Sequence, residues 1–522
     1  MKHSLSVVLL LLRGAAAAEW VVGQPVQTTS GVVRGHPAED HNEVSEYLGI
    51  PFAAPPLGPL RFAPPAAYVP KGNATIDARA FGPDCPALVS PVPANASDIV
   101  KANLGHLAQN GHNFSEDCLT LNIWTKPQDW PEEPRKAVLV WIYGGGFTTG
   151  STAIPFYNGQ VFAERAGTVV VSINYRVNVF GFPGAPLEDM NLGLLDQRKA
   201  VEWVRDNIAA FGGDPNRITL FGESAGARAV DIYSYAWTKD PIVNGFIAES
   251  GAAPLVSGTK HNPATWFELS TRLGCGGSAA ANKTVECVRG KTWRQVLDGM
   301  GTAGGTRRLL SFVPVVDEKV YFSDYDVRAK EGRFIKRPML VGNNDNEGGL
   351  SAATQKASPA AVDAINAGYT CGAAAAAARR RALGIPAWRY RFVPVWSNQA
   401  FAEGVGAYHS SEIPAVFGLS ESIFPDIPAS EEQLRLSATM NKAWTMFAQD
   451  PEKGLLDLRW PLYDAKSKFH VMRGRVGLMV IADDTLIILG EQNTRNVGFD
   501  LGERYDAKCA SLMSSMSSGK GA

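Results

Sequence analysis

Arg217-Ile-Thr-Leu-Phe-Gly-Glu-Ser-Ala-Gly226 is the stretch of sequence that decides the fold of this chain. Residues 217–221 form a short apolar run typical of a buried strand, and a helical pattern begins after Gly226. Gly222 and Gly226 permit a tight turn between the two elements, which exposes the hydroxyl of Ser224 above a sheet edge at a helix N-terminus. We therefore predict a nucleophilic serine at position 224, rather than a plain glycine-rich turn.

Further buried-strand patterns lie on both sides of this stretch, and a helical pattern covers residues 196–211. Near-continuous apolar runs separated by helices are typical of strands that are covered on both faces in a mixed or parallel sheet. We therefore expect an α/β architecture. The further strands that we expect in this sheet lie at residues 137–143, 168–174, 243–249 and 338–342.

The composition is typical of a large globular protein and excludes several other classes. The 522 residues include 50 Lys and Arg against 51 Asp and Glu, which gives a net charge of -1. Because this balance offers no general attraction for polyphosphate, and no local basic patch is evident, we expect no nucleic-acid partner. Hydrophobic residues make up 45% of the chain, so a large core can form. Beyond the N-terminus, no apolar run is long enough to predict a transmembrane anchor.

The N-terminal residues 1–18 are typical of a secretory signal peptide. Lys2 and His3 precede an apolar run over residues 5–12, and four alanines follow at 15–18. We predict cleavage after Ala18 and hence a secreted protein. A cytosolic N-terminal helix is the alternative interpretation.

The sequence also predicts a glycoprotein with a single main domain. We find no internal repeat and no interdomain linker, so residues 19–510 are expected to form one catalytic domain. Residues 511–522 are rich in Ser, Gly and Lys, which predicts a flexible tail. Four Asn-x-Ser/Thr sequons support export, at Asn73, Asn95, Asn113 and Asn282.

An even number of cysteines is a further feature of exported proteins. Proximity along the chain favours a Cys85–Cys118 bridge around a long loop and a Cys275–Cys287 bridge around a short Gly- and Asn-rich one. Cys371 and Cys509 then remain as a candidate third bridge near the C-terminal end. Free thiols are the alternative and would fit an intracellular enzyme, which the signal peptide argues against.

A nucleophilic serine requires a base, an acid that orients the base, and donors for an oxyanion. Gly144-Gly145-Gly146 follows the strand predicted at 137–143, so its backbone can approach a substrate and aim N–H groups at developing negative charge. A dinucleotide-binding loop is the alternative interpretation of these glycines. It fails on spacing, because the segment lacks the final glycine of G-x-G-x-x-G and no helical pattern follows.

The chain order Ser, acid, His that accompanies this strand–turn–helix motif leaves three candidate bases after Ser224. His409 lies in a polar loop just before an apolar segment, as expected of a base that reaches over a sheet edge. His261 would need an acid between itself and Ser224. The strand-like surroundings of His470 favour a structural role.

Glu347 is the best candidate for the orienting acid. It lies just past the end of the buried strand predicted at 338–342. Asp345 is the alternative, because a carboxylate two positions away could also reach the imidazole.

Several further motifs run nearly from end to end of the chain and, in this order, are far more specific than any one of them. Through them the chain resembles the type-B carboxylesterase/lipase family, which includes cholinesterases and many secreted fungal esterases. The motifs are Glu46-Tyr-Leu-Gly-Ile-Pro-Phe52, Pro55-Pro-Leu-Gly-Pro-Leu-Arg-Phe62, Ser115-Glu-Asp-Cys-Leu-Thr-Leu-Asn122, Trp141-Ile-Tyr-Gly-Gly-Gly-Phe147, Asn174-Tyr-Arg176 and Gly212-Gly-Asp-Pro215.

The resemblance implies an α/β-hydrolase fold, with a mostly parallel central sheet and helices on both faces. It implies that Cys85 and Cys118 bound a surface loop that acts as a lid in lipases of the family, and that Cys275–Cys287 matches the second bridge. Arg61 and Glu116 correspond to a structural ion pair at the base of the first loop.

The resemblance also assigns the site residues. Gly145, Gly146 and Ala225 would donate their backbone N–H groups to the oxyanion. Glu347 matches the acid of the family and His409 matches its base, so that Ser224 would form an acyl-enzyme during hydrolysis of a carboxylic ester. No metal or organic cofactor is implied.

Two departures from the family affect the pocket. The interval between Glu347 and His409 is shorter than usual, so we expect part of the helical wall to be missing and a more open pocket. Arg228 and Asp231 stand one and two helical turns from Ser224, where a solvated or paired helix face is a more common role than a substrate contact.

The substrate class is less well defined by the sequence. The loop over residues 86–117 is mostly polar or small and carries two sequons, which favours a carboxylesterase for soluble esters over a triacylglycerol lipase. An esterase dedicated to one biosynthetic or detoxification pathway is a third alternative. Non-catalytic adhesion relatives generally lack the serine or its partners, so the presence of all three here argues against an adhesion role.

Overall fold

The structure is a computed structural model that describes most of the chain between residues 20 and 509. The predicted signal peptide, the predicted tail and the sequons at Asn73 and Asn95 lie outside the described residues. Within the described part, no helix is both long enough and apolar enough to cross a membrane. The residues that are not described are 1–19, 71, 73–74, 90–91, 93–100, 102–104, 106–108, 129–133, 166, 255–260, 302–307, 401, 424–426, 464–468, 474–477, 483–484, 491–496 and 510–522.

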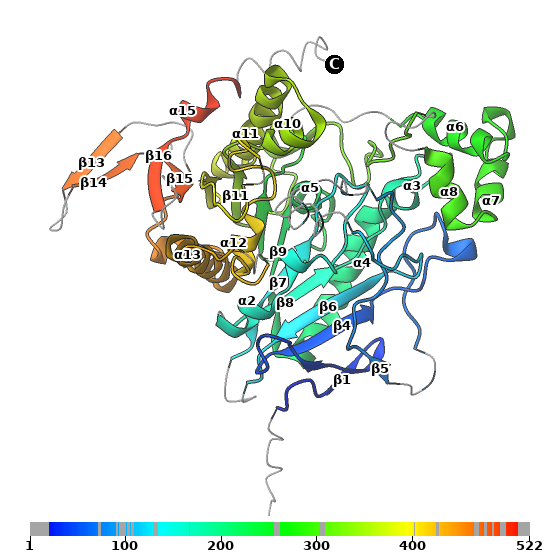
Figure 1. Cartoon of the computed structure of the whole chain (residues 1–522), viewed down its shortest axis with the longest axis horizontal. Helices are drawn as coiled ribbons and strands as arrows, with labels where there is room; N and C mark the ends of the chain where they lie inside the picture. Colours follow the sequence, from blue (N-terminus) through cyan, green and yellow to red (C-terminus); the bar gives the residue numbers. More distant parts are fainter. Residues whose placement is uncertain are drawn as a thin grey trace, which may run out of the picture.

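A sheet of 11 strands runs through the molecule (Figure 1). In order across the sheet, the strands are β16 (Val497–Leu501), β15 (Thr485–Leu489), β12 (Ala387–Phe392), β11 (Met339–Asn344), β10 (Gly245–Glu249), β9 (Gly213–Glu223), β7 (Lys136–Ile142), β8 (Val169–Ile173), β6 (Thr120–Thr125), β4 (Ser45–Pro51) and β3 (His36–Pro37). Neighbours from β15 to β8 pair in parallel, whereas pairs at the two edges are antiparallel. The α/β architecture with a mostly parallel sheet is thereby confirmed.

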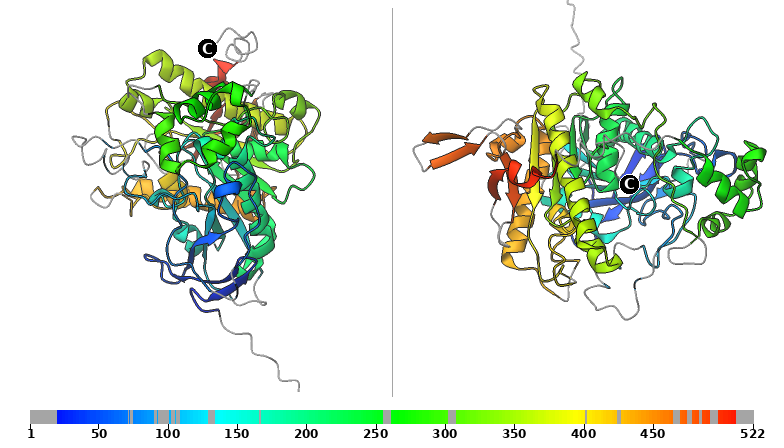
Figure 2. Two further views of the ribbon diagram at one scale, coloured as in Figure 1. Left: turned by 90° about the vertical axis from the view of Figure 1, so that its right-hand side faces the viewer. Right: turned by 90° about the horizontal axis from the view of Figure 1, so that it is seen from above.

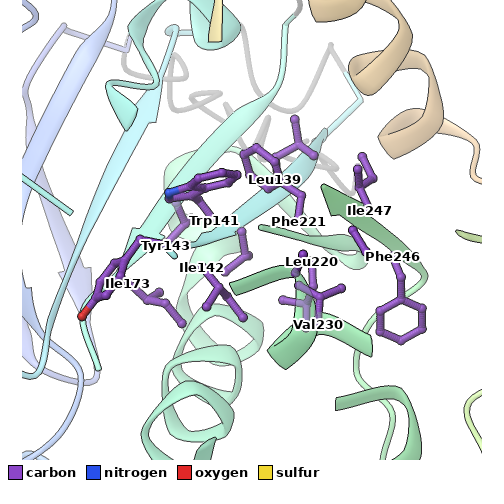
Figure 3. Packing of buried hydrophobic residues seen from close by; sticks show 14 of the residues in the cluster. Leu139, Trp141, Ile142, Tyr143, Ile173, Leu220, Phe221, Val230, Phe246 and Ile247 are labelled. Carbon is purple, nitrogen blue, oxygen red and sulfur yellow. The ribbon is translucent and has the colours of Figure 1, made fainter. Parts of the chain in front are cut away.

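The central strands are buried on both faces, as their continuous apolar sequences predict. Every residue of β8 and β10 is buried, and β7 is buried from Ala137 onward. On β9, the ring of Phe221 lies 6.2 Å from that of Phe162 and 5.6 Å from that of Phe417. The next position on the strand, Gly222, faces the other side of the sheet, because successive residues of a strand alternate between the two faces. Figure 3 shows part of this core.

Helices cover the two faces of the sheet (Figures 1 and 2). Helices α4 and α5 pack against β9 on one face, and Phe162 of α2 and Phe417 of α12 pack on Phe221 on the other. The helices are α2 (Gln160–Arg165), α3 (Asn178–Gly181), α4 (Leu192–Asn207), α5 (Ala225–Ala236), α6 (Ala264–Arg272), α7 (Lys283–Arg289), α8 (Trp293–Met300), α9 (Tyr325–Lys330), α10 (Gly349–Gln355), α11 (Pro359–Arg381), α12 (Ile413–Phe417), α13 (Glu431–Gln449), α14 (Gly454–Asp457) and α15 (Glu503–Asp506).

Helices α6, α7 and α8 form a small unit with its own core at one end of the molecule, opposite the hairpin of β13 (Phe469–Arg473) and β14 (Leu478–Ala482) (Figure 2). Its core contains the fully buried Trp266, whose ring meets that of Phe62 at 5.3 Å. Near the N-terminus, a separate small sheet is formed by β1 (Pro25–Thr28), β2 (Gly31–Arg34) and β5 (Ile76–Asp77).

All six cysteines are paired. The structure contains the bridges Cys85–Cys118, Cys275–Cys287 and Cys371–Cys509. The third bridge connects α11 to the C-terminal end of the described chain, across a sequence separation of 138 residues. Of the three bridges, Cys371–Cys509 therefore joins the most distant parts of the chain.

Candidate active site

Ser224 lies in a sharp turn between β9 and α5. Its backbone has φ 57° and ψ -119°, a conformation that non-glycine residues adopt rarely and at an energetic cost. The glycines on either side make the turn possible, because a Cβ at Gly222 or Gly226 would collide with the carbonyl oxygen of Ile142 on β7. The strand and the helix therefore approach β7 closely enough to present the Ser224 hydroxyl at the sheet edge.

A chain of hydrogen bonds connects three of the predicted site residues. His409 Nε2 lies 2.7 Å from Ser224 Oγ, and His409 Nδ1 lies 2.6 Å from Glu347 Oε2. These distances are those of a nucleophile, a base and an orienting acid in direct contact. The structure thus brings together side chains that lie far apart in the sequence.

Hydrogen bonds hold the carboxylate of Glu347 in place near the end of β11. Its Oε1 accepts hydrogen bonds from Ser250 Oγ at 2.6 Å and from the Asn344 backbone N–H at 2.7 Å. The side chain is fully buried, so these donors stabilise a charge that is removed from water. The remaining oxygen is left for His409.

The rival candidates lie elsewhere. Asp345 Oδ1 accepts a hydrogen bond from Arg391 Nε at 2.7 Å and takes no part in the hydrogen bonds of His409. His261 Nε2 lies 2.9 Å from the carbonyl oxygen of Gly184, and His470 belongs to the hairpin strand β13.

Three backbone amides, two after β7 and one at the start of α5, have no acceptor among the described residues. Within the described ranges, the N–H groups of Gly145, Gly146 and Ala225 donate to no protein group. Gly145 has φ 103° and Gly146 has φ 63°, values that suit glycine. Ala225 is the first residue of α5, where backbone N–H groups are free and the helix dipole favours negative charge. Such a cluster of donors can bind an oxyanion.

Two buried acids near His409 were not predicted from the sequence. Glu223 Oε1 lies 3.2 Å from His409 Nε2 and accepts a hydrogen bond from Ser410 Oγ at 2.8 Å. Glu412, fully buried, is bonded to Asn344 Nδ2. Both positions adjoin predicted site residues, Glu223 being next to Ser224 and Glu412 one turn after His409. Their positions next to predicted site residues are the feature of the sequence from which they could have been found.

The buried acids and His409 shift one another's pKa values. Burial raises the pKa of Glu223 to about 7 and that of Glu412 to about 8, because the surroundings disfavour a charged carboxylate and the acids repel one another. Burial opposes protonation of His409, but the charge of Glu223 and the hydrogen bond to Glu347 raise the pKa of His409 well above its ordinary value. A proton taken up by Glu223 would relieve that upward shift.

A cavity of about 690 Å³ opens in front of Ser224 and His409. One side is lined by α10 and α11, which the segment between Glu347 and His409 supplies, and the ring of Tyr369 lies 4.9 Å from that of His409. Most of the remaining lining is apolar. No group of three or more metal-binding side chains is present in the part of the chain that the structure describes.

The other predicted residues occupy structural positions. Arg61 Nε donates to Glu116 Oε1 at 2.6 Å in a buried ion pair next to Cys118. Asn113 and Asn282 are exposed, as a glycan would require.

The two charged residues after the elbow have different surroundings. Asp231 is fully buried and pairs with Arg380 of α11 at 3.0 Å. Arg228, in contrast, is exposed and lines the cavity.

Comparison with known proteins agrees with this fold. A model of the carboxylesterase family matches residues 23–369, a range that includes Ser224 and Glu347. A chlorogenic acid esterase from Aspergillus niger is 36% identical, over 83% of this chain and 84% of that protein. Secreted lipase 5 from Gibberella zeae is 33% identical, over 84% and 87%. A fumonisin B1 esterase from Sphingopyxis macrogoltabida is 32% identical, over 86% of each.

The fold is therefore the α/β-hydrolase fold, and the chain belongs to the carboxylesterase family. It is a carboxylic ester hydrolase.

Proposed function

We propose that the enzyme hydrolyses esters through an acyl-enzyme on Ser224, with His409 as base and Glu347 as orienting acid. The observation that carries the proposal is the hydrogen-bond chain from Ser224 Oγ through His409 to Glu347. Glu347 accepts from His409 Nδ1, which leaves Nε2 free to take a proton from the serine.

In the acylation step, His409 Nε2 takes the proton of the Ser224 hydroxyl while Oγ forms a bond to the ester carbonyl carbon. The electron pair of the C=O bond moves to the carbonyl oxygen, where the amides of Gly145, Gly146 and Ala225 stabilise it. The tetrahedral intermediate collapses as the bond to the alcohol oxygen breaks. His409 gives its proton to that oxygen, and the alcohol leaves.

In the deacylation step, water takes the place of the alcohol. His409 Nε2 removes a proton from water while the water oxygen bonds to the acyl carbon. The bond from that carbon to Ser224 Oγ then breaks, and the proton returns to Oγ. One ester and one water thus give one acid and one alcohol, and the enzyme is regenerated.

We propose a soluble ester as the substrate rather than a lipid aggregate. The described residues at the C-terminal end of the Cys85–Cys118 loop are mostly polar. Hydrogen bonds hold this part of the loop in place, because Gln109 Nε2 and His112 Nδ1 both bond to Asp84, at 2.6 Å and 2.7 Å. A loop held in this way is poorly suited to opening over a lipid surface. The relative named a secreted lipase keeps the lipase alternative in the test below.

We further propose that the protein is secreted and carries glycans. Three disulfides are typical of an oxidising compartment, and one of the relatives is named as secreted. The exposed sequons at Asn113 and Asn282 are the described positions that can carry glycans. A shift in mass after glycosidase treatment of the secreted protein tests this part of the proposal.

The decisive experiment measures hydrolysis of p-nitrophenyl esters, from acetate to palmitate, by secreted wild type and by Ser224→Ala. We expect activity that is lost with Ser224 and is highest for short, soluble esters. A jump in rate for long chains above their solubility limit would make the enzyme a lipase. Equal activity of wild type and Ser224→Ala would refute the acyl-enzyme.

A further inference from the structure

We propose that Arg228 binds a carboxylate of the substrate, so that the enzyme favours esters that also carry a free acid group. The inference rests on the proposed function, because it concerns the same cavity and the same nucleophile. It adds a chemical class of substrate and assigns the residue that selects it.

Arg228 is placed directly beside the reacting serine. Its backbone N–H donates to the carbonyl oxygen of Ser224 at 2.9 Å, which is the first hydrogen bond of α5. Residues four apart lie on the same face of a helix and are separated by about 6 Å along its axis. Accordingly, Arg228 and Ser224 line the same cavity.

The guanidinium of Arg228 has no partner among the described residues. In the part of the chain that the structure describes, it makes no ion pair and no hydrogen bond, and the residue is exposed. Other arginines are paired, as Arg176 is with Asp196 at 2.7 Å and Arg380 with Asp231 at 3.0 Å. Among the described residues that line the cavity, the carboxylate is Glu347, which is already bonded to His409. A cation in the cavity is therefore left for a ligand.

A second donor lies with Arg228 at the same wall. Tyr321 lines the cavity, and its hydroxyl makes no hydrogen bond to another described residue. Burial raises the pKa of Tyr321 and outweighs the opposing charge of Arg228, so the hydroxyl keeps its proton and remains a donor. A planar guanidinium and an O–H group that line one cavity are the kinds of donor that bind the two oxygens of a carboxylate.

The rest of the cavity suits the apolar body of such a substrate. Val313 and Pro314 line it near Tyr321, and Leu350 and Ile365 line it from α10 and α11. An ester with an aliphatic or aromatic body and one carboxylate would satisfy both parts of the wall. A neutral triacylglycerol would leave the Arg228 charge without a partner.

The test compares two pairs of esters that differ at the acid group. The first pair, 4-nitrophenyl hydrogen glutarate and 4-nitrophenyl methyl glutarate, places the carboxylate on the acyl side. The second, 3-acetoxybenzoate and 3-acetoxybenzamide, places it on the alcohol side. For each pair we would measure the ratio of kcat/KM for the charged ester to that for the neutral ester. Because both values come from one enzyme preparation, a general loss of activity or folded protein cancels.

We expect this ratio to fall about tenfold or more in Arg228→Gln for at least one pair, because charge-assisted hydrogen bonds are among the stronger polar contacts. Arg228→Lys should fall between wild type and Arg228→Gln. Added salt should lower the wild-type ratio and leave that of Arg228→Gln nearly constant. Arg165→Gln, which removes an exposed charge at the end of α2, should keep the wild-type ratio.

Equal ratios in wild type and Arg228→Gln for both pairs would overturn the assignment. So would an Arg165→Gln ratio as low as that of Arg228→Gln, because the effect would then belong to net charge. Failure of the acyl-enzyme is a separate result, in which Ser224→Ala hydrolyses the neutral esters as fast as wild type.

Discussion

Around His409, acidic side chains are packed more densely than a serine nucleophile and its base alone would require. Glu223, Glu347 and Glu412 are all buried, and the pKa of Glu223 and that of Glu412 are raised because a charge on each is unfavourable in these surroundings. In the proposed mechanism His409 acts as a base only in its neutral form, so the pKa of His409 sets the lower pH limit of activity, and the charges of the neighbouring acids shift that limit.

Replacing Glu223 by glutamine should therefore shift the pH profile. A negative charge at Glu223 stabilises the imidazolium and raises the pKa of His409, so its removal lowers that pKa. His409 then stays neutral at lower pH, and the acidic limb of kcat/KM against pH moves to lower pH. The measurement is the pH dependence of kcat/KM for a short p-nitrophenyl ester.

Glu286→Gln on α7 is the matched control, because it removes an exposed carboxylate from the small helical unit. Its acidic limb should coincide with that of wild type. An acidic limb of Glu223→Gln that stays in place or moves to higher pH would contradict the influence of Glu223 on His409.

The proximity of Ser224, Glu347 and His409 could be predicted, because motif, chain order and resemblance all restrict where these residues lie. Glu223 and Glu412 could not, because their importance depends on being buried beside His409. No local pattern in the sequence tells a buried glutamate from an exposed one. The same holds for Arg228, whose helical position is evident but whose exposure to the cavity depends on what packs around it.

In the turn between β9 and α5, close packing against the backbone of β7 explains why glycines stand at positions 222 and 226. A Cβ at Gly226 would collide with the carbonyl oxygens of Ile142 and Tyr143, which belong to backbone that cannot move aside cheaply. We expect Gly226→Ala to lower the free energy of unfolding by about 3 kcal/mol, as overpacking of a rigid site does. Denaturant unfolding followed by circular dichroism provides the measurement.

Gly368 of α11 is the matched glycine, because nothing lies within 4 Å of a Cβ built there. In a helix interior, alanine is preferred over glycine by roughly 0.5–1 kcal/mol, so Gly368→Ala should stabilise the protein by about that amount. If both substitutions changed stability equally, the close approach to Ile142 would not explain the requirement for glycine.

The elements around the turn were easier to predict than their ends. The helix predicted over 196–211 forms α4 from Leu192 to Asn207, and then tightens into a 3-10 turn that ends at the left-handed Gly212. The strand predicted over 217–221 extends as β9 from Gly213 to Glu223, because its first residues pair irregularly with β7. Tertiary pairing, which is not encoded in local propensity, thus lengthens the strand.

Across the full chain, the disulfides differ greatly in the length of chain that they close. Cys371–Cys509 spans 138 residues and Cys275–Cys287 spans 12. If a bridge acts mainly by restricting the unfolded chain, its stabilisation grows with the logarithm of that length. Loss of Cys371–Cys509 should then cost about 2 kcal/mol more than loss of Cys275–Cys287.

The measurement compares the free energy of unfolding of the double variants Cys371→Ala/Cys509→Ala and Cys275→Ala/Cys287→Ala. An equal cost, or a larger cost for the shorter loop, would show that native packing around each bridge outweighs the chain-length effect. Reduced wild type provides the reference in which all three bridges are open.

The centre of the sheet could be predicted from sequence, whereas its edges could not. Strands β7 to β11 have continuous apolar runs because both of their faces are buried. The edge strand β16 has only one buried residue, Leu501, and is therefore hard to tell from a loop. The separate core around Trp266 was also not predicted, because it depends on contacts with Phe62, far away in the sequence.

The distribution of the site over the chain has one more consequence. Ser224 follows β9, Glu347 follows β11, and His409 precedes α12, so none of these segments carries the chemistry by itself. A growing polypeptide that has formed β9 and α5 holds a serine without a base. If His409 is the base, as we propose, this hydroxyl becomes strongly nucleophilic only after the residue 185 positions later has been added and folded into place. Under the proposed mechanism, covalent capture of Ser224 by a fluorophosphonate would therefore count finished molecules.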